Sequence, residues 1–393
     1  MGRHARKQTF GGPAVVAVAV VAAVITLVMA FVKPDLTAST EHALTSASLP
    51  PSETSSRLSL GITATPSAVP SPTTAAPTPP AGVTLAFAGD VHFTGRTGPL
   101  LDAPATAFGP IAQTLSAADI AMVNLETAIT ERGQEEPKQF HFRAPSTALD
   151  ALVAAGVDVA SLANNHAADY GPVGLDDTLA AIDQGGLPVV GIGRDAASAY
   201  APYRTEVRGT GLSFFAVSQV QDRTYAAWTA TDSSPGIAST GDRARLVEGV
   251  RAASTAGDVA IVYVHWGVEG EPCPTQEMTT LATDLAAAGA DAIVGTHAHL
   301  LLGAGYLDQP GSTAYVAYGL GNFLWWRTRA TSDDTGVLTL TVNDGSVVES
   351  EFTPAVIDDA GRPQPVLGPA VPAKRTGFEQ LRGCAGLLLK PVG

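Results

Sequence analysis

The sequence predicts an α/β protein with a layered core, and three observations predict this class. Apolar runs such as 83–88 and 259–264 have the length and composition of buried strands. Segments such as 243–258 lie between these runs and carry apolar residues at helical spacing. Late in the chain, 336–357 has the pattern of an antiparallel hairpin. Alternating strands and helices of this kind form layers around one core.

Strand and helix signals alternate along most of the chain. Pro172 opens one expected helix, in which Leu175, Leu179 and Ile182 share a face. On the same criteria, helices are expected at 109–119, 146–158, 171–186, 243–258 and 277–291. Strands are expected at 83–90, 120–126, 159–166, 187–193, 259–267, 292–295 and 313–325, with hairpins at 205–220 and 336–357.

The chain of 393 residues is acidic, with 23 Lys and Arg against 37 Asp and Glu and a net charge of −14. Such a chain repels phosphate backbones, so no nucleic-acid partner is expected. Its hydrophobic content of 45% is sufficient for a large core. Contact with a polyanion would need a local basic patch, for which Arg143 and Arg327 are candidates.

The N-terminal segments predict where the protein is located. Residues 1–10 form a basic start, and 11–32 are uncharged and long enough to cross a bilayer of about 30 Å. We expect a transmembrane signal-anchor there, with a cleaved signal peptide as the alternative. The rest would be extracytoplasmic on a single-pass protein of the cell membrane, because basic residues stay in the cytoplasm. Ser, Thr, Pro and Ala dominate 33–82, which predicts a disordered stalk before a folded domain at 83–355 and a C-terminal tail at 356–393.

Polar side chains follow five of the predicted strands, at the point where each strand ends. They are Asp90 and His92; Glu126; Asn164, Asn165 and His166, with Asp169 close behind; His265, with Glu269 close behind; and His297 and His299. Each group alone fits turn chemistry or a satisfied core histidine. Sites in α/β sheets form beyond the carboxyl ends of the strands, so the whole set is expected to converge. Imidazole, carboxylate and amide ligands suit Mn, Zn or Fe, and two such ions can clamp a phosphoryl group.

The order of these motifs resembles that of calcineurin-like metallophosphoesterases: Asp-x-His, an acidic residue, Asn-His, His, and Gly-x-His-x-His. The blocks NLETAIT, SLANNHAADYG, VHWGVE and YGLGNF are more similar to the CapA-type branch, the bacterial capsule proteins linked to poly-γ-glutamate synthesis. The resemblance extends over about 83–323. It implies a metallophosphoesterase-like α/β sandwich that binds two divalent transition-metal ions.

Carried over by position, the resemblance implies a role for each polar residue. The first ion would be bound by Asp90, His92 and His299, and the second by Asn165, His265 and His297. Glu126 would bridge the two ions, and His166 would act as general acid. The chain departs from the family pattern at two places. NLE replaces the usual Gly-Asp-x-x-Asp element, and Ala298 stands where the CapA branch usually has proline.

Several neighbouring residues have both a functional and a structural interpretation. Asp169 would orient His166, or would cap the helix that follows it. Glu269 would orient His265 or contact substrate, or would be an exposed loop charge. Asn322 lies at a strand end, where a turn is as reasonable as a substrate contact. The candidates for substrate contacts are Asn164, Glu269, Asn322 and Arg143.

The chain has two cysteines, Cys273 and Cys384. A disulfide is allowed outside the membrane, and it would tie the C-terminal tail to the loop that follows His265. The sequence leaves this pairing and two free thiols both open.

These observations predict a membrane-anchored, extracytoplasmic, metal-dependent hydrolase. By resemblance it would act on a capsule or cell-envelope polymer or on a phosphorylated precursor. One alternative is a metal-dependent amide-bond enzyme that acts on poly-γ-glutamate. The other is a non-catalytic polymer-binding or tethering subunit of a capsule synthesis and export complex. The expected partners are the membrane, an anionic envelope polymer and subunits of such a complex.

Overall fold

The structure, a computed structural model, describes residues 82–327 and 332–391. The expected cytoplasmic start, signal-anchor and nearly all of the stalk lie outside these residues. None of the helices within the described ranges combines the length and the apolar character that crossing a membrane requires.

The first of two large sheets is built around β1 (Val83–Val91). This strand pairs in parallel with β2 (Ile120–Leu125) and antiparallel with β16 (Asp334–Asn343). The strand order is β18-β17-β16-β1-β2-β5-β6, and β15 also pairs with β1. The other strands of this sheet are β5 (Val159–Ser161), β6 (Val189–Val190), β15 (Asn322–Leu324), β17 (Ser346–Ile357) and β18 (Pro363–Pro365).

The second sheet is built around β11 (Val259–Trp266), which lies in parallel between β9 (Thr210–Ser218) and β12 (Ala292–His297). Its strand order is β19-β13-β14-β12-β11-β9-β8. The remaining strands are β8 (Tyr203–Val207), β13 (Ala304–Leu307), β14 (Tyr315–Ala317) and β19 (Leu387–Leu388). Two small ribbons pair β3 (Ala128–Ile129) with β4 (Arg143–Ala144), and β7 (Ile192–Gly193) with β10 (Gly236–Ile237).

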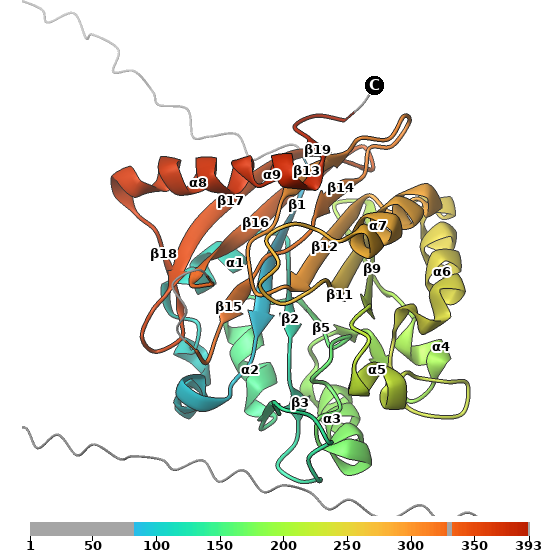
Figure 1. The fold of residues 1–393 in the computed structure, drawn as a ribbon, viewed down its shortest axis with the longest axis vertical. Helices are drawn as coiled ribbons and strands as arrows, with labels where there is room; N and C mark the ends of the chain where they lie inside the picture. Colours follow the sequence, from blue (N-terminus) through green and yellow to red (C-terminus); the bar gives the residue numbers. More distant parts are fainter. Residues whose placement is uncertain (1–81, 328–331, 392–393) are drawn as a thin grey trace, which may run out of the picture. The chain divides into compact units, whose positions relative to one another are not determined.

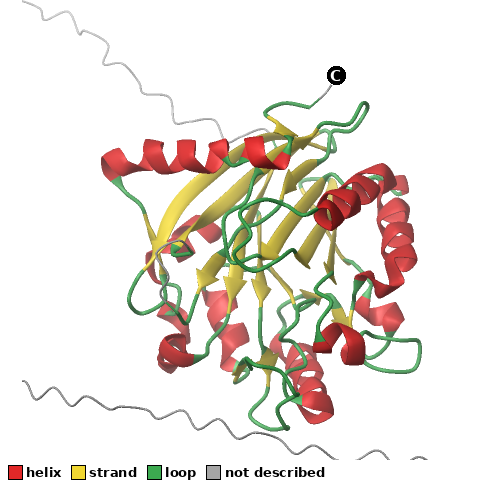
Figure 2. Ribbon diagram, in the orientation of Figure 1, coloured by secondary structure: helices red, strands yellow, loops and turns green. Residues whose placement is uncertain are grey.

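Helices lie around the strands, which occupy the middle of the folded part (Figures 1 and 2). The first sheet packs against α2 (Thr147–Ala154) and α3 (Gly171–Gly185), and the second against α6 (Arg243–Thr255) and α7 (Gln276–Ala288). The remaining α-helices within the described residues are α1 (Ala112–Leu115), α4 (Ala196–Ala199), α5 (Arg223–Trp228), α8 (Val371–Gln380) and α9 (Arg382–Ala385). The 3-10 turns are Gly95–Asp102, Pro104–Thr106, Gly109–Ile111, Thr240–Asp242 and Gly368–Ala370.

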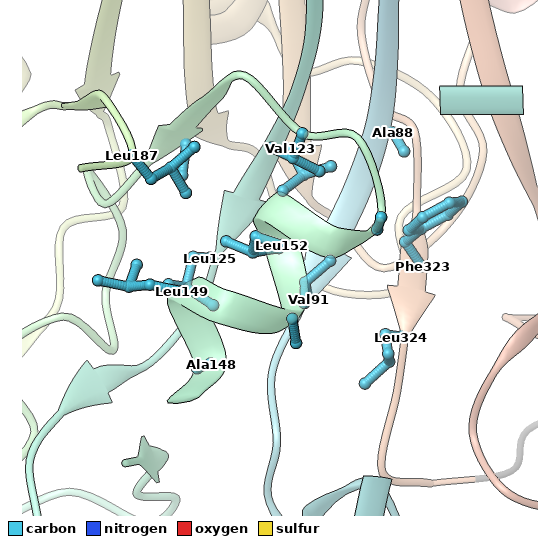
Figure 3. Close-up of a cluster of buried hydrophobic side chains, with 14 of the residues drawn as sticks. Ala88, Val91, Val123, Leu125, Ala148, Leu149, Leu152, Leu187, Phe323 and Leu324 are labelled. Carbon is cyan, nitrogen blue, oxygen red and sulfur yellow. The ribbon is translucent and has the colours of Figure 1, made fainter. Parts of the chain in front are cut away.

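Successive side chains of a strand point to opposite faces of its sheet. One face of each large sheet therefore packs against the other sheet, and the opposite face packs against helices. Phe87 of β1 and Tyr263 of β11 belong to one buried apolar cluster between the sheets. The alternate residue Ala88 faces the helices instead, where Leu149 and Leu152 of α2 approach the strands (Figure 3). Four layers result, in the order helices, sheet, sheet, helices, and the predicted layered α/β class is confirmed.

Some elements differ from the sequence prediction. The helix expected at 109–119 is only a 3-10 turn followed by the one-turn α1. The strand expected at 187–193 is divided into β6 and β7 at Gly191, whose φ of 86° breaks the extended backbone. The tail expected at 356–393 starts inside β17, and its described part contributes β18 to one sheet and β19 to the other.

Gly295 in β12 is a position where the packing requires glycine. A Cβ there would collide with Trp266 Nε1 and with the carbonyl of Tyr318, which are joined by a hydrogen bond of 2.8 Å. Gly295→Ala should therefore lower the free energy of unfolding by roughly 2–4 kcal/mol, measured by urea denaturation. Gly377→Ala is the matched control, since an added Cβ in α8 meets open space. Equal stability of the two variants would contradict this account of the packing.

Candidate functional site

The polar residues predicted at five strand ends gather at one edge of the two sheets. Strands β1, β2 and β5 run parallel in the first sheet, and β11 and β12 run parallel in the second. The arrowheads of β1, β2, β11 and β12 point to the same end in Figure 1. Loops that leave these ends therefore place their side chains in a common space between the sheets.

Two buried carboxylates form the base of the site. Asp90 accepts a hydrogen bond from the side chain of Asn124 (2.8 Å) and one from the backbone N–H of His297 (3.2 Å). Burial acts to raise the pKa of Asp90, but the adjacent His299 and His265 bring it below its ordinary value. Glu126 has no such donors, and burial, assisted by the charge of Asp90, raises its pKa well above the usual range. Because of their surroundings, Asp90 favours the charged carboxylate, whereas Glu126 favours the neutral carboxylic acid.

Three asparagines hold the loops at the ends of β2 and β5. The amide of Asn164 donates to Asn124 Oδ1 (3.0 Å) and to the carbonyl of Leu125 (2.8 Å). Its own carbonyl oxygen accepts from the backbone N–H of His166 (3.0 Å). Asn165 Oδ1 instead lies 2.9 Å from His265 Nε2. Asn164 therefore stabilises the loop through internal hydrogen bonds, whereas Asn165 presents its amide oxygen to the cluster.

Three histidines of the second sheet complete the cluster. The His265 ring centroid lies 4.7 Å from that of His297, which lies 5.7 Å from that of His299. His297 and His299 adopt left-handed φ values of 85° and 57°. Such values are uncommon outside glycine and are most readily explained where a site requires them. The turn through Ala298 thereby directs two imidazoles into the same small space.

Aromatic stacking fixes the two histidines of the first sheet. Phe142 lies between His92 and His166, with ring centroids at 4.3 Å and 4.0 Å. Trp325 meets the edge of His92 (4.5 Å) and also lies 4.5 Å from His299. These rings exclude water from the imidazoles, and burial consequently lowers the pKa of His92 and of His166 well below the ordinary value.

Asp169 links His166 to Lys138, which is largely but not fully buried. Its Oδ2 lies 2.6 Å from His166 Nδ1 and accepts the backbone N–H of Phe142 (2.7 Å), while Lys138 Nζ lies 2.7 Å from Oδ1. Lys138 also donates to the backbone carbonyl of Asn165. Burial raises the pKa of Asp169 to about 6, although the lysine opposes the shift. Of the two interpretations of Asp169, the contact with His166 is present in the structure.

Several buried polar atoms of the cluster have no hydrogen-bond partner among the residues that the structure describes. They are both carboxylate oxygens of Glu126, Nε2 of His92 and Nδ1 of His297, whereas His299 Nδ1 lies 3.4 Å from Asp90 Oδ2. Buried polar atoms are almost always satisfied, so this concentration points to a missing partner. Glu126, His297 and His299 bring ligand atoms within 4.8 Å of one another. Burial also lowers the pKa of His297 strongly and that of His265 to about 4, which favours the neutral imidazole that binds metals. The residues therefore fit a divalent transition-metal ion.

A hollow of about 130 Å³ opens beside this cluster. Of the predicted residues, His166, Glu269, His299, Asn322 and Arg327 line it. Asn322 Oδ1 is buried there, and none of the described residues donates a hydrogen bond to it.

Other predicted residues lie elsewhere or have a different contact. The guanidinium of Arg143 lies 4.7 Å from the Tyr170 ring, and neither Arg143 nor Asn164 lines the hollow. Glu269 lies 3.9 Å from His299 Nε2, so the histidine that it approaches is His299. Cys273 and Cys384 form a disulfide with their Cα atoms 5.7 Å apart, which ties the loop after β11 to α9.

Sequence reasoning missed Lys138, Phe142 and Trp325. Asn124 belongs to the polar group Asn124-Leu125-Glu126 at the end of the second predicted strand, but the sequence assigns it no role, because asparagine at a strand end is also ordinary turn chemistry. Phe142 and Trp325 are apolar residues whose ring partners come from distant strands, and no local pattern signals such contacts. Lys138 has the pattern of a surface charge, yet its side chain is only 11% exposed.

Fold and site together define a layered α/β domain with a buried histidine, carboxylate and amide cluster at one sheet edge. The family model described as "Bacterial capsule synthesis protein PGA_cap" matches residues 84–325. The chain therefore belongs to this family of bacterial capsule synthesis proteins.

Relatives with named roles include the capsule biosynthesis protein CapA of Bacillus anthracis, 30% identical over 59% of this chain and 56% of its own length. The PGA biosynthesis protein CapA of Bacillus subtilis is 28% identical over 64% of each chain. A probable polyglutamine synthesis accessory protein of Mycobacterium tuberculosis is 31% identical over 47% of this chain and 50% of its own. The chain thus spans about half to two thirds of the length of these relatives.

Among solved structures, a phosphatase from Mycoplasma pneumoniae aligns with a TM-score of 0.43 and 14% identity, over 71% of this chain and 95% of its own. The sulfate thiohydrolase SoxB of Thermus thermophilus aligns with the same TM-score and 15% identity, over 78% and 61%.

Substitution of Asn164 tests whether the hydrogen bonds among the asparagines stabilise the site. Asn164→Ala removes three buried hydrogen bonds and leaves their partners unsatisfied, which should cost roughly 2–4 kcal/mol of unfolding free energy. Asn343→Ala, at the exposed end of β16, should stay within about 0.5 kcal/mol of the wild type. The unfolding free energies of both variants are compared by urea denaturation. If Asn164→Ala lowers this free energy by less than about 0.5 kcal/mol, as a surface change does, the network does not stabilise the site.

Proposed function

We propose that this chain is a metal-dependent hydrolase of the phosphoesterase kind, anchored to the cell membrane with its folded domain outside, that acts in capsule or poly-γ-glutamate synthesis. The supporting observation is the group of unpartnered buried ligand atoms around Glu126. Membership of the capsule synthesis family supports the process, and the motif resemblance to metallophosphoesterases supports the reaction.

The residues that would hold the ions are those that already converge. Two ions would be shared among Asp90, His92, Glu126, Asn165, His265, His297 and His299, as Mn, Zn or Fe. When bound, such ions draw electron density from an ester oxygen and acidify water. Asn165 Oδ1 and His265 Nε2, the atoms through which these residues would bind an ion, lie 2.9 Å apart.

His166 is placed to move a proton. Asp169 accepts a hydrogen bond from Nδ1–H of His166, which leaves the lone pair of the neutral ring at Nε2. Nε2 would first take up a proton and could then pass that proton to a leaving oxygen in the hollow. Phe142 holds the ring by stacking, and its backbone N–H holds Asp169. Asn322 Oδ1 is a free acceptor for a substrate hydroxyl or amide in the same hollow.

Metal content tests the proposal directly. The full-length protein, purified without chelator, should carry about two transition-metal ions per chain by mass spectrometry. His297→Ala and Asn165→Ala should each lower that content, because each removes a ligand. His141→Ala is the matched control, since His141 lies outside the cluster and bonds the carbonyl of Glu136 (2.6 Å).

The same preparations decide among the alternatives. Phosphate esters and γ-glutamyl amides assayed in parallel separate a phosphoesterase from an amide-bond enzyme. A wild-type protein that binds no metal, even with added Mn and Zn, would reject the hydrolase and favour the polymer-binding or tethering subunit.

Anchoring is tested by fractionation. If 11–32 is an uncleaved signal-anchor, the protein should remain in the membrane fraction after a carbonate wash, at the mass of the full chain. A variant that lacks 11–32 should stay out of that fraction. Recovery of a soluble, shortened wild-type protein would instead indicate a cleaved signal peptide.

A further inference from the structure

A second and larger hollow lies beside the candidate site. Its volume is about 580 Å³, compared with about 130 Å³ for the hollow at the histidines. It lies between α8, the strands β16 and β17, and the loop that follows β11. Its walls are mainly apolar, with Leu301, Phe352, Pro354, Phe378 and Leu381 among them.

The two hollows share part of their walls. Gly270 and Leu300 line both of them. Leu300 directly follows His299, and the backbone N–H of Gly270 donates to the carbonyl of Ala298 (2.9 Å). The larger hollow therefore begins where the histidine turn ends.

The charges of the larger hollow do not suit a polyanion. Its one cationic side chain among the described residues, Lys374, is already paired with Asp334. Successive carboxylates of a γ-glutamyl chain would each need a partner on leaving water. A hydrocarbon chain needs none and gains free energy from contact with apolar walls.

The walls of this hollow are tied in place. Phe378 of α8 stacks on Phe352 of β17 with a centroid distance of 4.0 Å. The Cys273–Cys384 disulfide joins the loop on one side to the helices on the other. The space is therefore held open by covalent and packing contacts.

We infer that the substrate is a phosphate ester of a long hydrocarbon chain, whose phosphate lies at the histidine cluster and whose chain lies in the apolar hollow. This inference rests on the proposed function. The hydrocarbon can be a straight acyl-type chain or a branched prenyl chain, since both offer the same apolar surface.

The test compares phosphates that share a headgroup. The full-length protein, loaded with Mn and held in amphipol, is titrated calorimetrically with ethyl, octyl and geranyl phosphate. Octyl or geranyl phosphate should bind at least about tenfold more tightly than ethyl phosphate, because the longer chain is buried. A gain with octyl or with geranyl phosphate alone identifies the straight or the prenyl source.

Gly377 allows the hollow to be filled without disturbing the fold. It lies on α8, lines the hollow, and has open space where a Cβ would be. Gly377→Leu should remove the gain from the longer chain and leave metal content and ethyl phosphate binding unchanged. Gly383→Leu is the matched control, since it also faces open space but does not line the hollow. Ala373→Leu, on the same helix and also lining the hollow, repeats the test if Gly377→Leu does not fold.

The outcomes separate the two proposals. Equal binding of all three phosphates to metal-loaded wild type, no binding of any, or a gain that persists in Gly377→Leu would overturn the hydrocarbon subsite. None of these results contradicts the proposed metal centre. Absence of metal from the wild type would instead remove the proposed function, and the inference with it.

Discussion

The burial of Glu126 without a hydrogen-bond partner is the constraint on which the rest of this site depends. A carboxylate removed from water loses several kcal/mol unless a cation or donors replace the solvent. Among the residues that the structure describes, none donates a hydrogen bond to either oxygen, and His265 Nε2 lies 3.4 Å from Oε1. The neighbouring structure keeps this arrangement from relaxing. The asparagine network holds the loop on one side, and the left-handed turn at His297 and His299 holds the other.

Such a site is unfavourable for folding by itself, so the surrounding layers must offset its cost. The two sheets pack over an apolar interface that includes Phe87, Phe214 and Tyr263. Helices cover both outer faces. Because β1 and β12 end at the site while their middles lie in this core, the polar cluster is held by strands that are buried along nearly all of their length. The backbone strain at the histidines is then tolerable.

The C-terminal segment contributes to both large sheets and to the apolar hollow beside the site. Through β18 and β19 it joins both sheets, and through α8 it forms one wall of the apolar hollow. The loop after β11 forms the opposite wall and also carries Glu269 and Gly270 beside the histidines. A change in this loop would therefore affect the small polar hollow and the large apolar one together.

The α/β class and the polar residues at five strand ends could be predicted from the sequence, because strand periodicity and the placement of polar groups after strands are local patterns. The family could be recognised as well, because its motifs occur in a fixed order. The remaining features depend on the packed structure. The splitting of 187–193, the docking of the tail and the burial of Lys138 depend on contacts between distant segments. The pairing of Cys273 with Cys384 and the aromatic rings around His92 do so as well. No local pattern encodes such contacts, since each becomes favourable only when the two sheets are already packed together.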